Sequence, residues 1–227
     1  MKITDVTVTL FKWENIPLKS YDAAVKMVKT NSDLGLVRIK TDEGVEGFGF
    51  LGLCVHPGSL DAPHIVRFLK PILMGQNPLY RERLYQNLSR MRAQVSTQAV
   101  CAVDAALWDL AGKISGLPIH ALIGTFRDKI PVYASSEQHE TVEGYVEQAL
   151  AVKEAGYHGY KLHPNQRWRE DISACKAVRK AVGDDFTLML DSRSGYDLGQ
   201  AVMVGRAIEE LGFLWYEEPL PYTDIYN

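Results

Sequence analysis

Polar and apolar residues alternate along the first part of the chain, and this alternation predicts β-strands. Residues 3–13 follow a period of two, which is the side-chain period of a half-buried strand. Residues 34–40 and 45–50 repeat the pattern on either side of the turn-forming run 41–44, so they predict a hairpin. The polar segment 19–31 is irregular, and long loops in compact domains are often functional. We expect the chain to begin with an antiparallel sheet and a long loop.

From Ala62 onward, apolar residues recur every three or four positions, which predicts helices over 64–73, 78–93 and 96–116. The last of these has Ser96 or Thr97 as its N-cap, Gly116 at its end and a proline shortly beyond. Strands followed by helices predict an α+β fold for this part of the chain.

After Lys129, strand segments alternate with helical segments. The expected strands are 130–136, 159–163, 186–191 and 213–219, and the expected helices are 142–156, 170–183 and 198–212. Successive βα units predict a parallel sheet. Their near-even spacing favours a barrel, although a sheet with reversed strand order stays open. Four strands are half of an eight-stranded barrel, so we expect a partial TIM-like barrel with two exposed strand edges.

Composition narrows the class of protein. The chain is 46% hydrophobic and 23% charged with a net charge of −3, and its basic residues are scattered, which argues against nucleic-acid binding. Cys54, Cys101 and Cys175 are odd in number and far apart, which argues against a disulfide framework or a zinc site. The alternating N-terminus is unlike a signal peptide, and no apolar run has membrane-spanning length. We expect a cytoplasmic protein without membrane or nucleic-acid partners.

Polar and charged side chains stand at the carboxyl ends of the expected strands, where βα folds gather functional groups. They are Ser135, Ser136, Lys161, His163, Asp191, Glu217 and Glu218. Lys161 and His163 share one side of their strand because the side-chain period is two. Asp191 and Glu217 end neighbouring strands, and paired carboxylates suit Mg²⁺. The alternative is that each acid is a solvated strand end or helix cap and that Lys161 lies on the surface.

At these residues the chain resembles the mandelate racemase and muconate lactonizing enzyme group of the enolase superfamily. The resemblance is carried by Lys161-Leu162-His163, by LMLD ending at Asp191 and by WYEEP containing Glu217, and it covers nearly the whole chain. Residues 99–124 are similar to the family's helix and linker between two domains. The resemblance implies an α+β capping domain with a linker helix over 1–125 and barrel strands one to four over 126–227. We expect the chain to be cut off after the fourth barrel strand.

The resemblance also implies roles for these residues. Asp191 and Glu217 match two ligands of Mg²⁺, and the third ligand would come from a following strand. Lys161 would neutralise the carboxylate of the substrate, and His163 would abstract its α-proton. The family commonly has a second lysine at the position of His163, but histidine also suits a general base because its ordinary pKa is about 6.5.

Further residues are expected to touch the substrate. Arg193 stands where the family often has asparagine, and it would clamp an anionic group or pair with an acid on the rim. Glu218 matches the acidic neighbour of the second metal ligand. In the family, loops of the capping domain also contact the substrate, and the corresponding stretches here contain Lys19, Tyr21, Phe50 and His56.

The resemblance implies a magnesium-dependent lyase that dehydrates a sugar acid after proton abstraction next to its carboxylate. A racemase or epimerase of the same family is the first alternative. Another metal-dependent barrel enzyme such as an aldolase, an inactive truncated fragment and a plain structural domain are the others. We expect a small carboxylate substrate, a homo-oligomer, and no turnover by the 227-residue chain alone.

Overall fold

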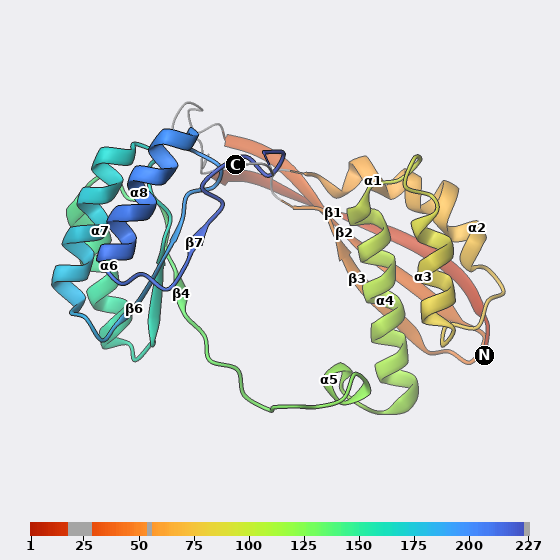
Figure 1. Cartoon of the computed structure of the whole chain (residues 1–227). Coiled ribbons are helices and arrows are strands. Elements are labelled where there is room, and N and C mark those ends of the chain that lie inside the picture. Colours follow the sequence, from red (N-terminus) through yellow and green to blue (C-terminus); the bar gives the residue numbers. More distant parts are fainter. Residues whose placement is uncertain (18–28, 54–55, 225–227) are drawn as a thin grey trace. The chain divides into compact units, whose positions relative to one another are not determined.

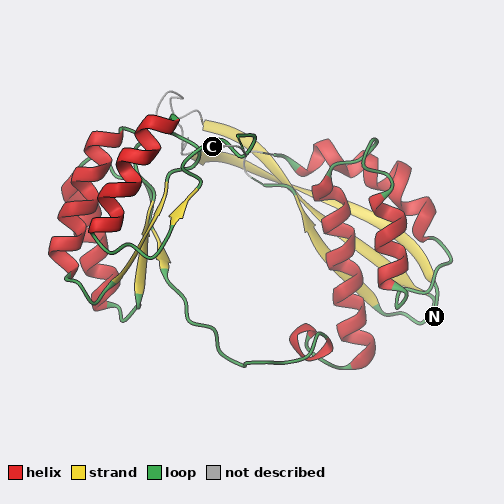
Figure 2. Cartoon of the chain, in the orientation of Figure 1, coloured by secondary structure: helices red, strands yellow, loops and turns green. Residues whose placement is uncertain are grey.

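The computed structural model describes residues 1–17, 29–53 and 56–224. These residues form two compact units, one made by the described residues up to 128 and the other by residues 129–224 (Figure 1). Unit 1 combines an antiparallel sheet with helices, and unit 2 combines a parallel sheet with helices (Figure 2). The chain therefore has an N-terminal α+β part followed by half of a TIM-like barrel, as the sequence predicts.

The sheet of unit 1 has the order β1-β2-β3, and its strands are β1 (Ile3–Pro17), β2 (Lys29–Thr41) and β3 (Glu46–Leu51). A register irregularity between Ile3 and Asp5 shifts the alternation of β1, so that both Ile3 and Val6 are buried although they are three residues apart. Residues 29–31 belong to β2, where Thr30 pairs with Ile16. The interpretation of 19–31 as an irregular loop was therefore wrong at its end.

The helices of unit 1 are α1 (Gly58–His64), the π-helical turn η1 (Ile65–Leu69), α2 (Lys70–Leu73), α3 (Arg81–Ser89), α4 (Thr97–Ser115) and α5 (Ile119–Leu122). Ser96 is the N-cap of α4, and Gly116 ends it in the left-handed conformation. This helix packs tightly on β3 because a Cβ at Gly49 would lie 2.1 Å from the Ala102 carbonyl oxygen. No described helix is both long and apolar enough to cross a bilayer.

Unit 2 has the strand order β4-β5-β6-β7, and all neighbours are parallel. The strands are β4 (Ala134–Ser135), β5 (Gly159–Leu162), β6 (Thr187–Asp191) and β7 (Tyr216–Glu217). The helices α6 (Val142–Glu154), α7 (Trp168–Val182) and α8 (Leu198–Glu210) lie on one side of this sheet (Figure 2). Within the described residues β4 and β7 each pair with one neighbour only. Both are shorter than the strands predicted from the sequence, 130–136 and 213–219.

Two sets of hydrogen bonds stabilise the segments next to β6 and β7. Asp197 and Gln200 form a reciprocal capping box at the start of α8, directly after the loop that follows β6. Arg179 is buried near the end of α7 and donates to the carbonyls of Phe186 and Leu211, at 2.7 and 2.8 Å. It therefore joins the segments that precede β6 and β7.

Candidate functional site

Lys161 joins two carboxylates at the carboxyl ends of neighbouring strands. Its Nζ lies 3.0 Å from Glu217 Oε2 and 3.3 Å from Asp191 Oδ2. Burial alone would lower the pKa of Lys161, but hydrogen bonds to Glu217 and Asp191 outweigh it and raise the pKa above its ordinary value of 10.5. The amine is therefore a cation held between two anions.

His163 completes this group, which we call the rim cluster (Lys161, His163, Asp191 and Glu217). Its Nε2 lies 2.9 Å from Asp191 Oδ2, and its Nδ1 lies 2.8 Å from the backbone carbonyl oxygen of Ser136. Because a carbonyl only accepts hydrogen bonds, the position of the Ser136 carbonyl assigns a proton to Nδ1. Nε2 faces the Asp191 carboxylate, which is also an acceptor, so both ring nitrogens are directed at hydrogen-bond acceptors.

The two carboxylates differ in their surroundings. The Asp191 side chain is 10% exposed, and it accepts from the backbone N–H of Arg193 at 3.1 Å in addition to its contacts with Lys161 and His163. The Glu217 side chain is 38% exposed and accepts from Trp215 Nε1 at 3.1 Å. Asp191 is therefore the fixed centre of the cluster, and Glu217 is its more accessible edge.

The cluster fits part of a magnesium site. One cation, the Lys161 ammonium, already contacts an oxygen of each carboxylate, so both oxygens converge on a single positive charge. Magnesium is commonly held by one or two carboxylates, and water and substrate complete its shell. In the part of the chain that the structure describes, no group of three or more His, Cys, Asp or Glu side chains could hold a metal ion. Asp191 and Glu217 are the residues of the cluster that could hold such a metal.

The structure distributes the expected substrate-binding residues unevenly. The backbone of Arg193 binds Asp191, whereas the Glu218 side chain is exposed and its backbone carbonyl accepts from Ser194 at 2.7 Å. His56 belongs to unit 1, where its Nε2 lies 2.9 Å from Asp61 Oδ2. Lys19 and Tyr21 lie outside the described residues.

The loops beyond the strand ends carry features that the sequence did not reveal. Gln166, Arg193, Ser194 and Glu218 all have a positive φ, between 43° and 63°, although none is a glycine. Such conformations are uncommon for these residue types and cluster at functional sites. Three of them follow β6 or β7, next to Asp191 and Glu217, so the backbone is strained where the cluster is built.

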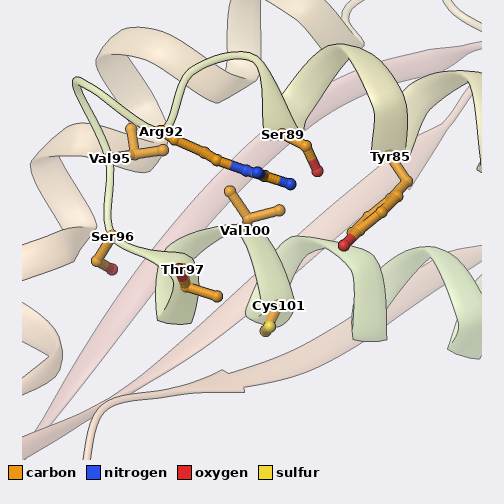
Figure 3. Close-up of a pocket in the computed structure, with 8 residues that line it drawn as sticks. All are labelled: Tyr85, Ser89, Arg92, Val95, Ser96, Thr97, Val100 and Cys101. Carbon is orange, nitrogen blue, oxygen red and sulfur yellow. The ribbon is translucent and has the colours of Figure 1, made fainter. Parts of the chain in front are cut away.

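Unit 1 has a separate hollow of about 210 Å³ between α3 and α4 (Figure 3). It is lined by Tyr85, Ser89, Arg92, Val95, Ser96, Thr97, Val100 and Cys101. Its Ser96 hydroxyl already accepts the Ala99 N–H as the cap of α4, at 3.0 Å. None of the expected site residues that the structure describes lines this hollow. Cys101 and Cys175 are free thiols, and burial raises the pKa of Cys175 well above its ordinary value.

Comparison with known proteins shows the family to which this chain belongs. The family model for the N-terminal domain of mandelate racemase and muconate lactonizing enzyme matches residues 3–124, and the enolase C-terminal domain-like model matches residues 144–227. The chain belongs to the mandelate racemase and muconate lactonizing enzyme family of the enolase superfamily, as the resemblance of its motifs implied.

Individual relatives include dehydratases and a racemase. The chain is 32% identical to L-talarate/galactarate dehydratase from Salmonella typhimurium, over 84% of this chain and 50% of that protein. It is 28% identical to N-succinyl-L-Arg/Lys racemase from Bacillus cereus, over 84% of this chain and 53% of that protein. D-glucarate dehydratase from Agrobacterium tumefaciens, solved with magnesium, superposes with a TM-score of 0.85 at 33% identity, over 99% of this chain and 62% of that chain. The chain spans about half the length of these two curated relatives.

Proposed function

We propose that this chain is part of a magnesium-dependent enzyme that abstracts the proton α to the carboxylate of a sugar acid and then eliminates water. The observation that carries the proposal is the rim cluster, which brings two carboxylates, a cation and a histidine together at the ends of three neighbouring strands. Similarity to L-talarate/galactarate dehydratase and to the D-glucarate dehydratase structure supports the choice of substrate class.

Asp191 and Glu217 would hold the metal, whose positive charge would lower the energy of the anion formed when the α-proton leaves. Lys161 would act through its charge, because its hydrogen bonds keep it protonated and therefore unable to accept a proton. Its ammonium would donate to the carboxylate of the substrate and offset the negative charge that develops there.

His163 would be the base. Its Nδ1 carries a proton because it faces the Ser136 carbonyl, so Nε2 is the atom that would take the α-proton once its contact with the acceptor Asp191 Oδ2 is broken. Nε2 lies 2.9 Å from Asp191 Oδ2, which keeps the base beside a proposed metal ligand. Further side chains would contact the substrate. Two of them, Arg193 and Glu218, come after the proposed metal ligands in the chain, and the others are Lys19, Tyr21 and His56.

Racemisation is the second candidate, because a racemase is among the relatives. It shares proton abstraction with dehydration and differs in the second step, in which the proton returns to the opposite face of the α-carbon. Incubating a catalytically active form of the enzyme with a sugar acid in D₂O distinguishes dehydration from racemisation. Dehydration releases water and gives a keto acid, whereas racemisation keeps every hydroxyl and gives the epimeric sugar acid with deuterium at the α-carbon.

Calorimetric titration of the 227-residue chain with Mg²⁺ tests the metal site. We expect binding that is abolished in Asp191→Ala and retained in the matched control Asp185→Ala, whose exposed acid precedes the opposite end of β6. Circular dichroism and intact mass must show that each variant is folded and complete. A folded chain that binds no Mg²⁺, or that binds it equally well without Asp191, would overturn the assignment.

A further inference from the structure

The parallel ladder between β4 and β5 ends with an exchange of hydrogen-bond partners at Ser136 and His163. The Ser136 N–H donates to the Lys161 carbonyl at 2.8 Å, as a parallel ladder requires. The next ladder bond would run from the His163 N–H to the Ser136 carbonyl. Instead, the His163 N–H donates to the Ser136 side-chain hydroxyl at 2.7 Å. The hydroxyl thus takes the place of the main-chain carbonyl.

The exchange makes the Ser136 carbonyl available to the imidazole ring. Its oxygen lies 2.8 Å from His163 Nδ1, so the same residue binds both the main chain and the side chain of the histidine. Ser136 and His163 are 6% and 5% exposed, and polar groups at such depth are nearly always hydrogen-bonded. An alanine at 136 would leave the carbonyl as the acceptor for the main-chain N–H as well.

A third contact holds His163 in place. The hydroxyl of Tyr145, on α6, donates to the His163 carbonyl at 2.8 Å. The main-chain N–H, the main-chain carbonyl and Nδ1 are therefore each bound by a buried neighbour. The ring presents its other nitrogen, Nε2, to the rim cluster.

We propose that Ser136 is a positioning residue for His163. Its hydroxyl replaces the ladder acceptor, and its carbonyl thereby binds Nδ1–H and directs Nε2 at Asp191 Oδ2. The value of this ring position for catalysis rests on the proposed function, in which Nε2 is the ring nitrogen that would face the substrate. The hydrogen-bond exchange itself does not depend on that function.

Nitrogen-15 NMR of the histidine rings in the 227-residue chain tests the proposal. The Asp191→Ala background removes the competing acceptor on Nε2, and alkaline solution keeps imidazole rings neutral. In this background we expect His163 to carry its proton on Nδ1. Adding Ser136→Ala should shift the tautomer ratio about 3- to 10-fold toward Nε2–H, the equivalent of one neutral hydrogen bond. Ser136→Thr, which keeps the hydroxyl, should restore the original ratio.

The possible outcomes separate this inference from the proposed function. A tautomer ratio that is the same with serine and alanine at 136, in chains folded by circular dichroism, would overturn the role of Ser136. So would a majority of Nε2–H in the Asp191→Ala chain that retains Ser136. The expected ratios, together with a lack of Mg²⁺ binding by the unaltered chain, would support the role of Ser136 and count against the metal site.

Discussion

Replacing Lys161 with methionine tests how the rim cluster is held together. Methionine keeps an unbranched apolar stem but removes the ammonium group. Asp191 Oδ2 and Glu217 Oε2 then lose a cation that lay 3.3 and 3.0 Å away. The substitution leaves two carboxylates at neighbouring strand ends without the charge that joins them.

The expected cost depends on burial. Two unit charges about 4 Å apart attract by about 4 kcal/mol at an effective dielectric constant of about 20, before desolvation is counted. Removing one partner of a buried pair destabilises a protein by about 3–5 kcal/mol. The Asp191 side chain is 10% exposed and falls in this class, whereas Glu217 is 38% exposed and adds at most about 1 kcal/mol because solvent screens it. We expect Lys161→Met to lower the free energy of unfolding by about 3–5 kcal/mol.

Urea unfolding measures this cost, and hydrogen exchange of the β5 and β6 amides reports on unit 2 separately. Mg²⁺ should restore more stability to Lys161→Met than it adds to the unaltered chain, because it supplies the missing positive charge. Lys176→Met is the matched control, since Lys176 is an exposed lysine on α7. If both variants are equally stable, the ion pairs of Lys161 do not hold the cluster together.

Three further substitutions test other parts of the structure. Tyr196→Phe removes a buried donor 2.7 Å from Asp171, a carboxyl whose pKa is raised by burial above its ordinary value of 3.8. Because the burial cost appears as pH rises from that value, urea unfolding should show a loss of about 1–3 kcal/mol at about pH 7 and a smaller loss below about pH 4. A hydrogen bond from Lys70 lowers the pKa of Asp5, so this pair stabilises unit 1 above pH 3.8 and its contribution is lost as pH falls through the lowered pKa. Asp5→Asn should abolish that pH dependence in urea unfolding and cost at most about 1 kcal/mol. Gly49→Ala should lower the melting temperature through a loss of roughly 1–3 kcal/mol, because its Cβ would lie 2.1 Å from a carbonyl of α4; an unchanged melting temperature would contradict this packing.

Elements whose signals are local could be predicted from the sequence. Helix α4 was predicted with both ends, because Ser96 and Gly116 are capping residues next to a clear helical period. The register irregularity near Asp5 and the π-helical turn η1 were not predicted. Both depend on how one element packs against another across the core. The periodicity of apolar residues within one segment carries no information about that packing.

In the candidate site, too, only the features with a local sequence signal could be predicted. Placing Lys161 and His163 on one side of a strand needs only the period of two, and the structure shows both next to Asp191. Ser136 contacts both the main chain and the ring of His163. This contact depends on the register between two strands, so neither residue type predicts it from the sequence. The left-handed conformation of Arg193 is also hidden, because arginine does not mark such positions as glycine does.

The contacts of Lys161 also bear on how the cluster would take up a metal. A cation that binds Asp191 and Glu217 would meet the positive charge of Lys161 there, so the metal and the ammonium would compete for the same two anions. An affinity for Mg²⁺ measured on this chain would therefore include the cost of the ion pairs that the metal disrupts. A displaced ammonium would still have hydrogen-bond donors to satisfy beside the strand ends, and a substrate carboxylate would be an anion of suitable charge. The ion pairs that hold the cluster together and the proposed role of Lys161 toward the substrate thus share one physical origin, a buried cation that always requires an anionic partner.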